Sequence, residues 1–187
     1  CRHAALGGHV AGHGTGPGLS DFDGRSEPAP LTAIERLFCC SPHSSGVLPA
    51  LAQAWDHLKL GPQRWLVAGA SSNDLAPEGE RLLLLSDGAE LVDWAEAVAA
   101  WRLPTLLLIP AGERLRAEAA LHYSLLKQQQ VPVLGLLQVG EPWHPADRQA
   151  DALPWLGCWN PEEPQELAAF GSLLQQRFMQ LDPSQGA

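Results

Sequence analysis

The sequence predicts an α/β domain, a three-layer sandwich with a mainly parallel sheet. The first observation is the stretch from Leu103 to Gly140, in which two apolar runs, LPTLLLIP and VPVLGLLQVG, enclose the amphipathic segment AGERLRAEAALHYSLLKQQQ. Strands that are buried on both faces have such continuous apolar runs, and a helix between them indicates a βαβ unit with parallel strands. The second observation is that strand-like and helix-like segments also alternate elsewhere in the chain, which favours helices on both faces of one sheet.

The other elements follow from the same periodicities. Gly61-Pro62 ends one helix, Asp87 is the expected N-cap of the next, and Pro104 opens the first strand of the βαβ unit. Asn160, followed by Pro161, is the expected start of the last helix. Besides the βαβ unit, we expect a short helix or strand at 31–38, a helix at 47–58, strands at 64–70 and 81–86, a helix with an apolar face at 91–101, a polar loop at 141–151, a strand at 153–159 and a helix from 160 onward.

Composition divides the chain into two parts. Residues 1–30 are rich in Gly, His and Pro, which predicts a flexible arm, and residues 31–187 are long enough for a single α/β domain. The first residue is Cys1 and the one methionine is Met179, so we expect the chain to be a fragment or a processed product.

Charge and cysteine usage limit the classes of partner. The net charge of −9 argues against binding to nucleic acid or to an anionic membrane surface. No apolar run reaches the roughly 18 residues of a membrane span. The four cysteines fit neither a zinc site nor a disulfide framework, which favours a reducing, cytoplasmic setting.

Several polar residues have an ordinary structural interpretation. The histidines of the arm, at positions 3, 9 and 13, match no metal-ligand spacing. Asp56 and His57 are adjacent on a helix and therefore point apart. Ser71 and Ser72 follow a strand, but A-G-A-S-S is not the G-x-S-x-G turn of a serine nucleophile. None of these groups predicts catalysis or metal binding.

Five segments, in order, resemble the dethiobiotin synthetase family. The segment S-P-H at 41–43 resembles a short S-P-H segment of that family, and RWLVAGA at 64–70 resembles the strand that ends in its V-E-G-A-G-G. The other three are DWAEAVAAWRLPTLLLI at 93–109, the helix and strand at 121–137, and LPWLGCWNP at 153–161. The part from Arg64 to Trp159 resembles the C-terminal part of these enzymes.

The resemblance implies a P-loop ATPase fold, a homodimer and an enzyme that uses ATP and Mg²⁺ to close the urea ring of dethiobiotin from a diamine and CO₂. It places nucleotide-binding residues at Gln138, Asn160 and Pro161, and substrate-binding residues at Ser41, His43, Gly69, Ala70 and Ser71. No catalytic residue and no metal ligand is assigned.

The sequence departs from the family at the charged positions. It has no G-x-x-x-x-G-K-[ST] loop, since the Gly-rich stretch at 12–18 lacks a lysine and contains Pro17. Ala68 stands where the family has the glutamate of V-E-G-A-G-G, and alanine cannot hold Mg²⁺. Gln138 stands where an asparagine is expected to contact adenine.

Three hypotheses remain at the level of sequence. The chain is an incomplete or diverged ATP-dependent ligase of the dethiobiotin synthetase type, a catalytically inactive α/β domain that acts through protein–protein contacts at a sheet edge or its Trp-rich end, or another P-loop α/β enzyme such as an amidotransferase-linked synthetase.

Overall fold

A computed structural model describes residues 36–42, 46–67, 71–76, 79–86, 89–140, 143–161 and 163–181. The predicted arm at 1–30 lies outside these residues. The elements are β1 (Leu37–Cys40), α1 (Val47–His57), β2 (Gln63–Leu66), the 3₁₀ helix η1 (Ser72–Leu75), β3 (Leu82–Leu85), α2 (Leu91–Ala100), β4 (Thr105–Pro110), α3 (Leu115–Gln128), β5 (Val133–Val139), α4 (Pro145–Ala150), β6 (Trp155–Trp159) and α5 (Pro164–Leu181).

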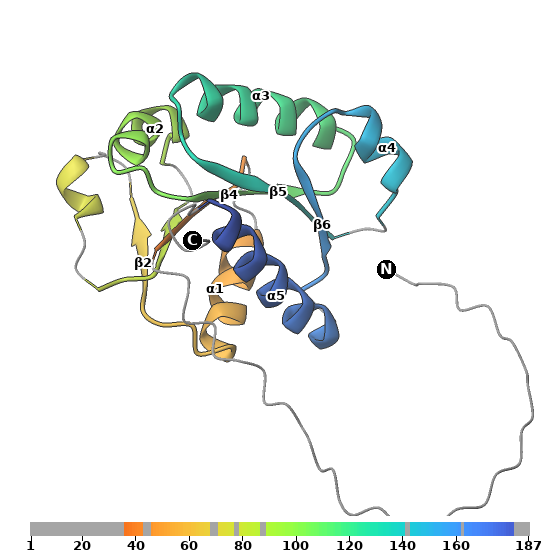
Figure 1. The fold of residues 1–187 in the computed structure, drawn as a ribbon, viewed down its shortest axis with the longest axis horizontal. Helices are drawn as coiled ribbons and strands as arrows, with labels where there is room; N and C mark the ends of the chain where they lie inside the picture. Colours follow the sequence, from red (N-terminus) through yellow and green to blue (C-terminus); the bar gives the residue numbers. More distant parts are fainter. Residues whose placement is uncertain are drawn as a thin grey trace, which may run out of the picture. The chain divides into compact units, whose positions relative to one another are not determined.

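The strands form one sheet of six in the order β2-β3-β1-β4-β5-β6, and every neighbouring pair is parallel. Helices α2 and α3 cover one face and α1 and α5 cover the other (Figure 1). The predicted α/β class with a parallel sheet in three layers is confirmed. The βαβ unit corresponds to β4, α3 and β5, which pair as expected.

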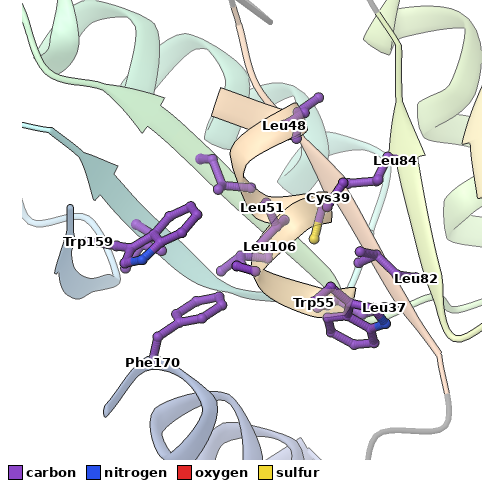
Figure 2. Close-up of a cluster of buried hydrophobic side chains, with 14 of the residues drawn as sticks. Leu37, Cys39, Leu48, Leu51, Trp55, Leu82, Leu84, Leu106, Trp159 and Phe170 are labelled. Carbon is purple, nitrogen blue, oxygen red and sulfur yellow. The ribbon is translucent and has the colours of Figure 1, made fainter. Parts of the chain in front are cut away.

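Side chains of the central strands alternate between the two faces, as the pleat of a strand requires. In β1, for example, Leu37 and Cys39 pack toward α1, whereas Phe38 and Cys40 pack toward α2 and α3. The face toward α1 carries Leu48, Leu51 and Trp55 of that helix, together with leucines of β3 and β4 and with Trp159 and Phe170 (Figure 2). Near-continuous leucine in these strands therefore reflects burial on both sides.

Several boundaries differ from the sequence predictions. The stretch at 141–151, which was expected to be loop, contains α4. Helix α2 begins at Leu91, with Glu90 as the preceding residue, so Asp87, which lies outside the described residues, is not its N-cap. Helix α5 begins at Pro164, because Asn160 and Glu163 form a turn in which the Glu163 amide donates to the Asn160 carbonyl at 3.1 Å.

The apolar patterns of the sequence predict that Trp65, Trp94 and Trp101 pack in the core, but two of these three side chains are partly exposed. Trp94 is buried at 1% exposure, but Trp65 is 39% exposed and Trp101 is 41% exposed. Trp65 lies on β2, which among the described strands has a neighbour on one side only, and Trp101 follows the last residue of α2. Periodicity predicts which face of a helix or strand is apolar. It does not predict whether that element lies at the centre of the sheet or at its edge.

Among the helices that the structure describes, none combines the length and the apolar character needed to cross a bilayer.

Candidate functional site

The strand order defines one place where a ligand is expected. The connection after β1 leads toward β2 through α1, and the connection after β4 leads toward β5 through α3, on the opposite face of the sheet. Such a reversal leaves a crevice at the carboxyl ends of the two strands, and ligands of open α/β sheets bind there. The described residues at this crevice belong to the β1–α1 loop and the β4–α3 loop.

The β1–α1 loop has the length of a phosphate-binding loop, but it lacks the Lys and the Ser/Thr of such a loop. From Ser41 to Leu48 the chain matches G-x-x-x-x-G-K-[ST] in length, with Gly46 at the second glycine. Gly46 precedes α1 with φ of 87°, and a Cβ there would meet nothing within 4 Å. However, Val47 and Leu48 stand at the Lys and Ser/Thr positions, and both are buried in the core.

The sequence has no lysine elsewhere that can reach this loop. Its two lysines are Lys59, two residues beyond α1, and Lys127, in the last turn of α3. Both helices start at the carboxyl ends of strands and run back across the sheet, so their final residues lie near the opposite edge. Among the described residues, the start of α1 therefore lacks the Lys and the Ser/Thr of a phosphate-binding loop, and Val47 and Leu48 do not fit a Mg-phosphate group.

Magnesium ligands are also not assembled elsewhere in the described ranges. No group of three or more His, Cys, Asp or Glu side chains converges among the described residues. Ala68 and Asp87, which follow β2 and β3, lie outside these residues.

The predicted site residues are spread along the sheet and do not form one pocket. Ser41 follows the central strand β1, Gln138 lies near the end of β5, and Asn160 follows β6. With about 4.8 Å between neighbouring strands, Gln138 and Asn160 lie about 10 and 14 Å across the sheet from β1. His43, Gly69 and Ala70 lie outside the described residues, and Pro161 is exposed next to Asn160.

Ser71 has a structural role. Its hydroxyl accepts a hydrogen bond from the Asn73 amide at 3.3 Å and so caps η1, which leads the chain from β2 to β3. Ser71 is separated from β1 by two strand positions in the direction opposite to Gln138. A single ligand therefore cannot contact Ser71 and Gln138 through short side chains.

Gln138 lies on β5, and Asn160 directly follows the neighbouring strand β6. Gln138 pairs in register with Ile109 of β4 and Cys158 of β6, and only 4% of it is exposed. Its side-chain amide donates to the Gly140 carbonyl at 3.3 Å. Asn160, which is half-buried, lies two residues beyond Cys158 on the adjacent chain segment. Together they put two amide groups at the carboxyl ends of β5 and β6.

The cysteines nearest to the crevice are not nucleophiles. Cys39 and Cys40 end β1, and both are free and fully buried. Burial raises the pKa of the Cys40 thiol to about 12 and raises the pKa of Cys39 well above its ordinary value, with a smaller contribution from Cys40. Both thiols are neutral at pH 7, and neutral buried thiols do not react.

Cys158 differs from these two, since the structure records it as disulfide-bonded. The spacing of the four cysteines does not fit a disulfide framework, so this bond was not expected from the sequence.

The reversal between β1 and β4 was missed in the sequence because strand order is not visible there. The available signal was the loop 41–46, which joins a buried strand to a helix. Comparison with models of known families finds no match for this chain, and no curated protein matches it significantly.

Proposed function

We propose that the chain is a diverged nucleotide-binding relative of the dethiobiotin synthetases, which keeps the base-binding side of the fold and does not close the urea ring by itself. The proposal depends on the contrast between two places at the carboxyl ends of the strands. Amide side chains remain at the ends of β5 and β6, where the resemblance places the adenine base, whereas the start of α1 has buried Val47 and Leu48.

The binding prediction follows from that contrast. Adenosine, ADP and Mg-ATP should bind with affinities within about tenfold of one another, because the α1 N-terminus offers only its backbone amides and dipole to the phosphates. Gln138→Leu should weaken adenosine binding about tenfold, or about 1.4 kcal/mol. Isothermal titration calorimetry measures both effects.

Gln149→Leu is the matched control, since Gln149 is an exposed glutamine on α4 and the same amide is removed. This variant should bind adenosine like the parent chain. Mg-ATP binding far tighter than adenosine binding, or production of dethiobiotin from labelled CO₂, ATP and the diamine, would show that the ligase machinery is present.

We further propose that two copies of the chain associate through β2, because this edge strand carries exposed apolar side chains. Trp65 on β2 is 39% exposed and Val67, the residue after β2, is 64% exposed, and β2 is the outermost of the described strands, where another strand can be added. A homodimer is also what the resemblance implies. The second copy is the occupant that this edge fits best, since its own β2 presents the same exposed Trp65 at the same outer position of the sheet.

Trp65→Glu is expected to weaken self-association at least tenfold in sedimentation equilibrium, because a carboxylate would be placed on the apolar edge. Trp101→Glu is the control, as Trp101 is exposed to a similar extent, 41%, and follows α2 rather than β2. Equal dissociation constants for the two variants would place the interface elsewhere.

A further inference from the structure

Helix α4 is attached to the domain in a different way from its neighbours. No residue of α4 is buried, whereas α1, α2 and α3 each bury apolar side chains in the core. Figure 1 shows α4 beside α3 and β6. What holds this helix is therefore not an apolar face.

A charged group, here called the α4 latch, makes the attachment; it consists of Arg116, Arg148 and Asp151. Asp151 follows α4, and its side chain is only 3% exposed. One carboxylate oxygen contacts Arg116 Nε of α3 at 2.9 Å, and the other contacts Arg148 Nη1 at 3.0 Å. The same carboxylate thus joins α3 to α4.

Aromatic contacts extend the latch to β6. The Arg148 guanidinium carbon lies 5.3 Å from the centre of the Trp155 ring, which is within the range of a cation–π interaction. Trp143, just before α4, meets Trp155 edge to face at 6.2 Å. These contacts place Trp143, just before α4, and Arg148, within α4, against Trp155 of β6.

Two hydrogen-bond donors in or beside the α4 latch have no acceptor. Arg148 Nε and Trp155 Nε1 are buried without a hydrogen-bond partner. Buried donors without partners oppose the closed arrangement, and opening would let both reach water. Arg116 is 70% exposed, so its ion pair with Asp151 is weakened by solvent and salt.

We propose that the segment from Trp143 to Asp151 is a detachable strap, which Asp151 holds against α3 and β6. When the carboxylate loses its partners, the strap separates while the sheet remains folded, because none of its own residues belongs to the core. The strap connects the end of β5 to β6, so its release changes access to Gln138. Only this last consequence rests on the proposed nucleotide site.

Asp151→Asn tests the strap, because it removes the charge and keeps the shape. Hydrogen exchange of the amides from Ala146 to Ala152 should speed up at least tenfold in this variant, while amides of β4 and β5 keep the rates of the parent chain. In the parent chain, 1 M NaCl should also accelerate exchange of these amides, and it should have little effect in the variant. Asp147→Asn is the matched control, since Asp147 is an exposed acid on the same helix.

Unchanged exchange of the amides from Ala146 to Ala152 in Asp151→Asn would overturn the proposal. Equal acceleration throughout the sheet would overturn it as well, because the latch would then support the whole fold. The exchange experiment contains no ligand, so its result is independent of the nucleotide site. If adenosine binds the parent chain, a faster association rate in Asp151→Asn would connect the strap to that site.

Discussion

Replacement of Leu106 by alanine is expected to lower the free energy of unfolding by about 2–5 kcal/mol. Leu106 is fully buried on β4, where it pairs in register with Cys39 of β1 and Gly135 of β5. Figure 2 shows its side chain within the cluster between the sheet and α1. Since sheet and helix are both fixed by many other contacts, the space left by the lost atoms cannot close, and a cavity cost adds to the lost burial.

Leu121→Ala is the control for this effect. Leu121 is 67% exposed on α3, and alanine is a slightly better helix former, so the change in unfolding free energy should stay within about 0.5 kcal/mol. Urea unfolding followed by circular dichroism measures both variants, with an unchanged slope as evidence that the same surface unfolds. A loss below about 1 kcal/mol for Leu106→Ala would contradict the close packing of this cluster.

Much of the architecture could be read from the sequence, because leucine-rich strands and helical periodicity are local signals. The run TLLLIP gave the buried strand β4, and the spacing of Leu48, Leu51 and Trp55 gave the inner face of α1. What could not be read is which strands become neighbours. The position of β1 between β3 and β4 depends on pairing between residues about 45 and 70 positions apart, for which the sequence has no local signature.

The same limitation applies to the candidate site. Three residues that were expected to contact a ligand lie at or near the ends of strands: Ser41, Gln138 and Asn160. The order of the strands, which the sequence does not reveal, places Ser41 away from the other two. Ser71 followed a strand in the sequence and yet serves as the cap of η1. The α4 latch could not be predicted for a similar reason. Arg116 belongs to the connection between β4 and β5, and Asp151 belongs to the connection between β5 and β6.

Gly135→Ala is expected to destabilise the domain by more than any surface change, because the added methyl group has no room. Val133 and Gly135 of β5 pair with consecutive residues of β4, so Leu134 between them forms a bulge. Trp155 and Gly157 of β6 likewise pair with consecutive residues of β5, so Leu156 forms a second bulge. A Cβ at Gly135 would lie 2.5 Å from Leu156 Cγ and 2.8 Å from the Pro154 carbonyl oxygen. The overlap should cost about 1–3 kcal/mol.

Gly112→Ala separates this overlap from backbone strain. Gly112 has φ of 151° and Gly135 has φ of 156°, but a Cβ at Gly112 meets nothing within 4 Å. Both variants therefore carry a similar backbone strain of about 1–3 kcal/mol, and the difference between their unfolding free energies reports the overlap alone. Equal losses in urea unfolding would contradict the close approach of β6.

Combining Gly135→Ala with Leu156→Ala then divides the overlap between its two sources. The Leu156 side chain is removed in this pair, whereas the Pro154 carbonyl belongs to the backbone and stays in place. The double variant should therefore be less destabilised than the sum of the single variants, by about 0.5–3 kcal/mol, without recovering the full cost of the added methyl group. Strict additivity would mean that the methyl group meets the backbone only, and that the bulge at Leu156 does not press on β5.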